Sequence, residues 1–259
     1  MSWLVLTLLS VLLVSIANIL QKILMKGDTS NPYSYGIVFH FLIGFILLGF
    51  ALFHGSHFSL FSGNVLLLLL VVFLWGSCTV LVLKAVQLLD ASEVIVVSTL
   101  RVVVTVAASA IFLQETFDAH KILGAIVIIV STLLVVNLKK GFKINKGLLY
   151  VLGVVVVGGL AIVVDAVNVQ HYDVVAYNTM TNFMIGFMLL GFYPKALGQW
   201  REFVRPGFLK KMLPLGVFSA AQGILYLQAL THAGNAAQVG TIRQASVIVT
   251  VLLAVVFLS

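Results

Sequence analysis

The 259-residue chain is 61% hydrophobic and only 9% charged, and its formal net charge is +7. A soluble domain carries about a quarter charged residues, so this composition excludes an ordinary soluble protein and indicates an integral membrane protein. The positive charge does not predict a nucleic-acid partner, because the basic residues lie in short connections between apolar segments.

Long apolar runs predict transmembrane helices, which satisfy every backbone hydrogen bond within their own segment. In chain order the predicted helices are Trp3–Met25, Tyr35–Phe53, Asn64–Leu89, Glu93–Leu113, Lys121–Leu138, Gly147–Asn168, Val174–Tyr193, Phe208–Leu230 and Ala236–Leu258. Turn-forming pairs, Asn31-Pro32 and Pro206-Gly207, fall between these runs. We therefore expect an all-α integral membrane protein with nine transmembrane helices.

The second and seventh predicted helices contain copies of one sequence. Residues 41–50 read FLIGFILLGF and residues 183–192 read FMIGFMLLGF, with eight of ten positions identical at a spacing of 142. Such a match between distant segments indicates a duplicated membrane unit. The glycines within it are expected to permit close helix contact, and they are Gly44, Gly49, Gly186 and Gly191.

The repeat extends beyond this stretch, since the same spacing pairs Tyr35 with Tyr177 and His40 with Asn182. Further on, a spacing of 145 pairs Val94 with Val239, Thr105 with Thr250, and Phe112-Leu113 with Phe257-Leu258. A unit of this length holds five crossings, so the second copy must enter the membrane upside down. The expected domains are residues 1–138, a basic linker at 139–146, and a second repeat at 147–259.

The second copy ends after its fourth helix, because Gln114 corresponds to Ser259. We expect that a tenth helix belongs to this protein and that the sequence is a fragment. A protein that has nine helices in its complete form is the alternative.

Lysine and arginine placement predicts the orientation, because short cytoplasmic connections carry an excess of basic residues. With the N-terminus outside, the basic residues on the inner side are Lys22, Lys26, Lys84, Lys139, Lys140, Lys143, Lys146, Lys195, Arg201, Arg205, Lys210 and Lys211. The outer connections then hold only Lys121. We expect an extracytoplasmic N-terminus in a cytoplasmic membrane.

Two inverted five-helix units resemble the drug/metabolite transporter superfamily, specifically its EamA-type permeases. The best local support is the fourth predicted helix, where Leu113-Gln114-Glu115 stands at the Leu-Gly-Glu that typically closes it in the family. The resemblance implies ten helices and a central substrate cavity between helices one to four and six to nine. It implies transport and leaves the substrate open, and the cytoplasmic N-terminus of many members differs from the orientation that the charges favour here.

Charged residues inside predicted helices mark a pathway or a structural pair. Arg101 is expected to contact an anionic substrate or to pair with an acidic neighbour, and snorkelling to the interface is a further alternative. Asp165 and Arg243 share a predicted depth and could form either a gate or a static pair. Glu93 could carry a proton, although a carboxylate is also favoured at a helix start.

Other polar residues at membrane depth are candidates for lining a cavity. His40 and Asn182 occupy equivalent repeat positions, where the alternative is an ordinary interhelical hydrogen bond. The full set of cavity candidates is Asn18, Gln21, His40, Trp75, Arg101, Asn182, Gln222, Tyr226 and Arg243, with Asp165 and Glu93 as gating or coupling candidates.

We interpret the chain as a secondary transporter of a small organic metabolite or drug-like solute that works by alternating access. A non-transporting membrane scaffold is the alternative, and a membrane-embedded enzyme lacks a convincing catalytic constellation. No cofactor or metal is expected, since His54 and His57 lack a third ligand and no phosphate-binding loop is present. The expected partners are the solute and lipid, with a homodimer left open.

Overall fold

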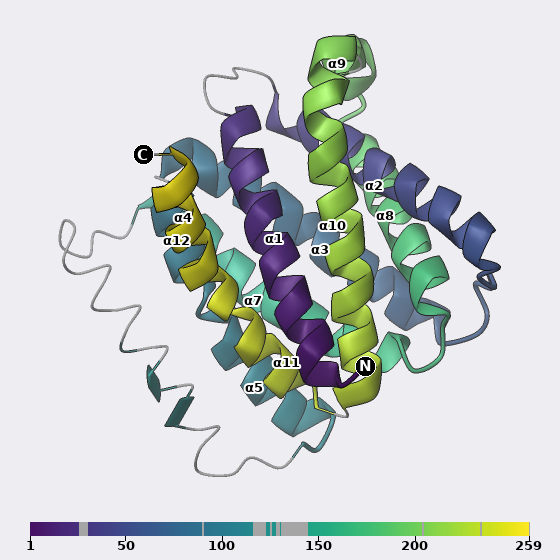
Figure 1. Cartoon of the computed structure of the whole chain (residues 1–259), viewed down its shortest axis with the longest axis vertical. Helices are drawn as coiled ribbons and strands as arrows, with labels where there is room; N and C mark the ends of the chain where they lie inside the picture. The colour runs from purple at the N-terminus through teal and green to yellow at the C-terminus, as the bar shows by residue number, and fades with distance from the viewer. Residues whose placement is uncertain are drawn as a thin grey trace.

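The computed structural model describes residues 1–25, 31–89, 91–115, 145–203, 205–233 and 235–258, together with residues 123–124, 126–127 and 130. Its helices are α1 (Trp3–Met25), α2 (Pro32–His54), α3 (Val65–Leu88), α4 (Ala91–Ser98), α5 (Arg101–Phe112), α7 (Lys146–Asn168), α8 (Val174–Phe192), α9 (Ala196–Phe203), α10 (Pro206–Ala233), α11 (Ala236–Arg243) and α12 (Ala245–Leu258). The helices form one bundle with the N-terminus at its lower end and α9 at its upper end (Figure 1). Most of the predicted helix Lys121–Leu138 falls outside the described residues.

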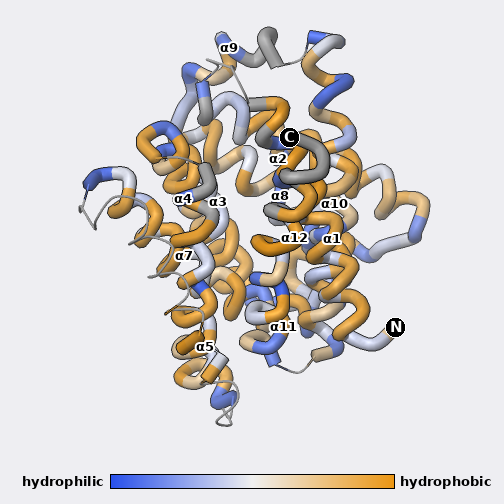
Figure 2. Tube along the Cα trace, turned by 60° about the vertical axis from the view of Figure 1, so that its left-hand side comes forward, coloured by the Kyte–Doolittle hydropathy of each residue, from blue (hydrophilic) through white to orange (hydrophobic). Residues whose placement is uncertain are grey.

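The regular structure of the described residues is helix, and the outside of the bundle is apolar, as expected for a multi-pass membrane protein. By length and composition, six helices could cross a membrane: α1, α2, α3, α7, α8 and α10. Large apolar side chains face outward, including Phe45 at 62% and Leu66 at 75% exposure. Hydrophilic residues gather at the ends of the bundle and at places in its interior (Figure 2). Outward apolar side chains of this kind suit a lipid environment.

Five of the helices begin after an asparagine or aspartate whose side chain accepts a hydrogen bond from a backbone N–H of the first turn. These residues are Asn31, Asn64, Asn145, Asp173 and Asn235. Such caps satisfy backbone donors that have no partner inside the helix. Local sequence therefore fixes where these helices begin.

The two repeats run in opposite directions and pack with pseudo-twofold symmetry. If α1, α2 and α3 correspond to α7, α8 and α10, the contact of α1 with α10 is equivalent to that of α7 with α3. Likewise α1 contacts α11 and α12, as α7 contacts α4 and α5. We call α3, α4, α5 and α7 the first helix group, and α1, α10, α11 and α12 the second helix group. Each group therefore combines helices from both repeats.

Helices α2 and α8 pack against each other near the pseudo-twofold axis (Figure 1). A Cβ atom on Gly44 would lie 3.1 Å from the Phe183 ring, and one on Gly186 would lie 3.2 Å from the Phe41 ring. The two contacts are reciprocal, because these positions are equivalent in the repeat. The prediction of close contact is confirmed for these glycines.

The same prediction is wrong for Gly49 and Gly191. A Cβ atom at either position would meet nothing within 4 Å. The duplicated stretch therefore packs through its first glycine, while the second lies where the helices leave open space.

The fourth and ninth predicted helices are not continuous, so the predictions Glu93–Leu113 and Ala236–Leu258 are corrected. The first breaks at Thr99-Leu100 between α4 and α5, and the second breaks at Gln244 between α11 and α12. Backbone hydrogen bonds there span three residues, as from the Val103 N–H to the Leu100 carbonyl, which is a local tightening of the helix. At a spacing of 145 the breaks are equivalent, and such breaks accompany substrate sites in many transporters.

A turn after α5 links the two helix groups at the lower end of the bundle. Gln114 has a φ of 53°, which is the left-handed region, and Glu115 follows it. One carboxylate oxygen of Glu115 accepts a hydrogen bond of 2.6 Å from the Ala236 N–H at the start of α11. The Leu113-Gln114-Glu115 motif thus closes α5 and caps a helix of the other repeat.

The left-handed backbone at Gln114 gives a stability prediction. Gln114→Gly is expected to raise the melting temperature in detergent, because the left-handed conformation costs a residue with a side chain about 1 kcal/mol. The converse control is Gly55→Ala at a φ of 72°, where a Cβ atom would meet no neighbour and only the backbone cost remains. That control should lower the melting temperature. An unchanged or lower melting temperature for Gln114→Gly would show that the side chain makes a compensating contact.

Candidate functional site

Asp165 is the centre of a hydrogen-bonded cluster inside the bundle. It lies near the end of α7 and is 4% exposed. The Trp75 Nε1–H of α3 donates to one carboxylate oxygen at 2.9 Å, and the Tyr177 hydroxyl of α8 donates to the other at 2.6 Å. Both partners donate, which matches an ionised carboxylate. Asp165 thus joins three helices through charge-assisted hydrogen bonds.

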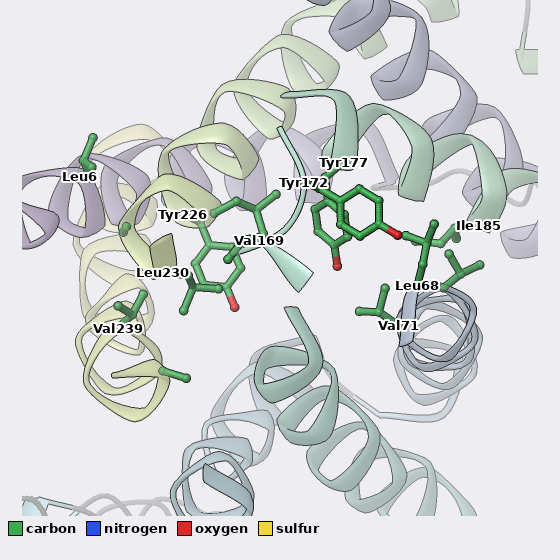
Figure 3. Close-up of a cluster of buried hydrophobic side chains, with 14 of the residues drawn as sticks. Leu6, Leu68, Val71, Val169, Tyr172, Tyr177, Ile185, Tyr226, Leu230 and Val239 are labelled. Atoms are coloured by element: carbon green, nitrogen blue, oxygen red, sulfur yellow. The ribbon is translucent and has the colours of Figure 1, made fainter. Parts of the chain in front are cut away.

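The Tyr177 hydroxyl is in turn held by Asn168, whose amide nitrogen lies 3.5 Å away. The same nitrogen donates to the Leu67 carbonyl at 3.2 Å. Figure 3 shows Tyr177 within a buried cluster that includes Val71, Val169 and Ile185. Apolar packing on this side orients the phenol, and its hydroxyl is committed to the carboxylate.

Arg243 is the centre of a second cluster, built on α10 and α11. Its Nη2 donates to Gln222 Oε1 at 2.7 Å, and its guanidinium carbon lies 3.9 Å from the centre of the Tyr226 ring. Gln222 and Tyr226 are four residues apart, so they share one face of α10. The ring and the amide together hold the guanidinium plane in place.

Arg101 begins α5 immediately after the helix break. Its Nε is buried and has no hydrogen-bond partner among the described residues. The side chain runs beside Gly158 of α7, where a Cβ atom would lie 3.8 Å from Arg101 Cδ. Both Arg101 and Asp165 contribute to the electrostatic environment of Arg243. The three charged groups therefore act on one region of the interior.

His40 and Asn182 are brought together across the pseudo-twofold axis. His40 Nδ1 lies 3.0 Å from Asn182 Oδ1, and His40 Nε2 lies 3.3 Å from the Thr79 hydroxyl. The Asn182 oxygen can only accept, so the network assigns the proton of the neutral ring to Nδ1. The two equivalent positions thus form an interhelical hydrogen bond.

The His40 network continues towards both charged clusters. The Thr79 hydroxyl lies 3.0 Å from the Trp75 carbonyl, so its single proton is shared between that oxygen and His40 Nε2, and Trp75 leads on to Asp165. On the other side the Asn182 amide donates to Asn178 Oδ1 at 3.0 Å. The Asn178 Nδ2 is buried without a partner among the described residues and faces Gly223, next to Gln222. Polar groups therefore follow one another from His40 towards Asp165 and towards Arg243.

The remaining predicted residues lie nearer the upper end of the bundle. Asn18 and Gln21 are half-buried on α1, and Glu93 lies in the first turn of α4. The structure places neither Asn18 nor Glu93 in the hydrogen-bonded clusters around Asp165 and Arg243.

Asp165 and Arg243 face the same region but do not bond to each other among the described contacts. Each instead has its own partners, Trp75 and Tyr177 for the carboxylate and Gln222 and Tyr226 for the guanidinium. The predicted pair is therefore absent in this conformation, although each charge contributes to the electrostatics of the other.

Sequence reasoning missed several residues that complete these clusters. Tyr177, Asn178 and Thr79 were not predicted as site residues, although each is polar and lies in a predicted membrane helix. A signal existed for Tyr177, because it aligns with Tyr35 in the repeat. Its role as the donor to Asp165 depends on how α7 and α8 pack, which the alignment does not give.

Comparisons with known proteins agree with this architecture. A solved structure, described only as "Crystal structure of protein", has a TM-score of 0.76 and 14% sequence identity over 97% of this chain and 86% of its own. At that identity the likeness concerns the fold alone. No curated protein matches the chain. The model of the EamA-like transporter family matches residues 1–137 and again residues 145–259. Because the two matches cover nearly the whole chain and coincide with its two repeats, the chain belongs to the EamA-like transporter family.

Proposed function

We propose that the protein is a secondary transporter that moves a small organic solute across the cytoplasmic membrane by alternating access. Family membership supports a membrane transporter. The observation that carries the mechanism is the distribution of the polar clusters over the two helix groups. Trp75, Arg101 and Asp165 belong to the first helix group, while Gln222, Tyr226 and Arg243 belong to the second. A solute bound between them would contact both moving parts.

The helix groups are better candidates for the moving units than the repeats themselves. The two repeats interleave, because α1 packs on α10 and α3 packs on α7. Separating the repeats would break these packed pairs, whereas a rocking of one helix group against the other would preserve them. Helices α2 and α8 contact both groups and would lie close to the axis of this motion.

Asp165 and Arg243 are the proposed gate. They lie on different helix groups and interact electrostatically without a direct bond in this conformation. In another conformation the guanidinium could move from Gln222 to the carboxylate and close the path. Glu93 remains a second coupling candidate near the upper end. The cavity roles of Asn18, Gln21, His40 and Asn182 belong to the same proposal.

The proposed orientation places the lower end of the bundle outside the cell. The basic residues Lys146, Lys195 and Arg205 then lie on the cytoplasmic side, as the excess of positive charge favours. We propose the same division into residues 1–138, a linker at 139–146 and a second repeat at 147–259.

Thiol labelling tests the orientation and the inverted topology together. In a Cys78→Ala background, single cysteines at His57 and Gln170 should react with an impermeant reagent added to intact cells. Single cysteines at Lys146 and Arg205 should react only in inside-out vesicles, because all four positions are exposed and only their side differs. A fully reversed pattern would contradict the orientation. Lys146 and Arg205 on opposite sides would contradict the topology.

Transport itself is tested in proteoliposomes with a panel of amino acids, sugars, carboxylates and organic cations. We expect uptake of at least one class that saturates with concentration and is absent from protein-free vesicles. A folded protein that moves no solute in the panel would contradict the proposed function.

A further inference from the structure

As far as the structure describes the chain, the interior of the bundle carries more positive than negative charge. Among the described residues, the charged side chains that the bundle interior encloses are one carboxylate, Asp165 in the last turn of α7, and two cations, Arg101 at the start of α5 and Arg243 at the end of α11. The other described acidic residues are Glu93 in the first turn of α4, Glu115 and Asp173 as caps, and Glu202 on α9. Charge inside a membrane protein is costly unless it is paired. Within the part of the chain that the structure describes, one positive charge is therefore left without a carboxylate counterpart in the interior.

Among the described contacts, several N–H donors of Arg243 have no acceptor. A guanidinium has five N–H donors, and among the described contacts only its Nη2 has an acceptor, Gln222 Oε1. The Tyr226 ring covers one face of the guanidinium, with the guanidinium carbon 3.9 Å from the ring centre. Arg243 is held in position by neutral groups, and its remaining donors are left for a partner of opposite charge.

Arg101 is less satisfied still. Its Nε is fully enclosed and has no hydrogen-bond acceptor among the described residues. Asp165 makes no hydrogen bond to Arg101 among the described contacts, and its two carboxylate oxygens already accept from Trp75 and Tyr177. A buried guanidinium nitrogen without an acceptor is unfavourable, so a partner that brings oxygen acceptors is favoured at this position too.

The surroundings of the two arginines point to one shared site. Tyr226 is 4% exposed, and its hydroxyl has no hydrogen-bond partner among the described residues. The ring projects from α10 into the bundle interior (Figure 3). It lies within electrostatic range of Arg101, Arg243 and Asp165. The helix break also places the positive end of the α5 dipole at Arg101, which favours an anion at the same place.

We propose that the transported solute is a small organic anion whose carboxylate or phosphate oxygens bind between Arg101 and Arg243. The two forked guanidinium groups match the geometry of such oxyanions. Tyr226 donates a further hydrogen bond through its free hydroxyl, and Trp75 provides an aromatic surface beside Asp165. This inference rests on the proposed function, since it names the substrate class for the site between the two helix groups.

Matched ligands test the charge requirement directly. Melting temperatures of the purified full chain are measured with a panel of carboxylates, each beside its amide and its amine, for example phenylacetate, phenylacetamide and phenethylamine. A second set of measurements uses sugar phosphates and their parent sugars. Comparing the two sets shows whether the site prefers a carboxylate or a phosphate. We expect anions to stabilise the protein and their neutral and cationic counterparts to have no effect.

Matched variants test the two arginines. Arg101→Gln and Arg243→Gln are expected to weaken anion binding at least roughly tenfold, whereas the exposed Arg205→Gln removes the same charge elsewhere and should bind like the unaltered chain. Arg101→Lys and Arg243→Lys retain the positive charge but lose the paired N–H donors of the guanidinium, so we expect anion affinities between those of the unaltered chain and the glutamine variants. These lysine variants keep the test usable where a glutamine variant folds poorly.

The outcomes separate this inference from the proposed function. Anion binding that depends on both arginines without uptake into proteoliposomes would support the site and contradict transport. Uptake of neutral or cationic solutes would support transport. If this uptake is the same in the Arg101→Gln and Arg243→Gln variants as in the unaltered chain, it would overturn the anion site. A folded protein that none of the anions stabilises would also overturn it.

Discussion

Replacing Asp165 with alanine is expected to destabilise the protein by about 2–6 kcal/mol. The substitution leaves two buried donors without an acceptor, the Trp75 indole N–H and the Tyr177 hydroxyl, and each unsatisfied group costs about 1–3 kcal/mol. The loss should appear as a lower melting temperature in detergent and a reduced yield of monodisperse protein.

Asp165→Asn is the matched control, because asparagine can keep both hydrogen bonds. Its oxygen can accept from Trp75, and its amide can donate to the Tyr177 oxygen. We expect this variant to fold at near-normal yield but to transport at least roughly tenfold more slowly, since the interior loses its carboxylate charge and the proposed gate loses one partner. Equal stability of the alanine variant would contradict the structural role. Normal flux in the asparagine variant would exclude Asp165 as a gating charge.

Gly159→Ala is the second substitution with a large expected effect. A Cβ atom there would lie 2.7 Å from Val104 Cβ and 2.9 Å from the Arg101 carbonyl oxygen. These atoms cannot rotate away, because one is backbone and the other is fixed to the backbone of α5. The start of α5 would have to move, at a cost of about 1–3 kcal/mol. We expect a lower melting temperature and weaker anion binding, since Arg101 would move with its helix.

Gly158→Ala on the same helix is the control. Its Cβ atom would lie 3.4 Å from Cys78 Sγ and 3.8 Å from Arg101 Cδ, which are close to ordinary contact distances. Alanine is also favoured over glycine inside a helix by about 0.5–1 kcal/mol. The variant should therefore match or slightly exceed the stability of the unaltered chain. Similar losses for both substitutions would mean that α7 tolerates no added side chain here, whatever the distance to α5.

The sequence alone was sufficient for the membrane class, the repeat and most helix boundaries. Lipid requires long apolar helices, and their connections are polar, so composition determines both. The spacing of 142 identified His40 and Asn182 as equivalent positions, and the structure shows that they meet where α2 packs on α8. The reciprocal packing of Phe41 on Gly186 and Phe183 on Gly44 follows from the same symmetry.

The breaks in the fourth and ninth predicted helices could not be predicted from composition. The broken segments contain Thr99, Leu100 and Gln244, and neither glycine nor proline marks them. Local tightening of the helix is decided by the neighbours that it packs against. At α5 the neighbour is Gly159, whose carbonyl accepts a hydrogen bond from the Thr105 hydroxyl at 3.2 Å.

The partners of the charged residues were also decided by the tertiary structure alone. Sequence reasoning placed Asp165 and Arg243 at the same depth, but depth does not determine which side chain is within 3 Å. Trp75 and Tyr177 reach the carboxylate because α3, α7 and α8 converge there, and α10 presents Gln222 and Tyr226 to the guanidinium. Hydrogen bonds depend on distances and angles between helices that are far apart in the chain, whereas hydrophobicity is a property of each segment by itself.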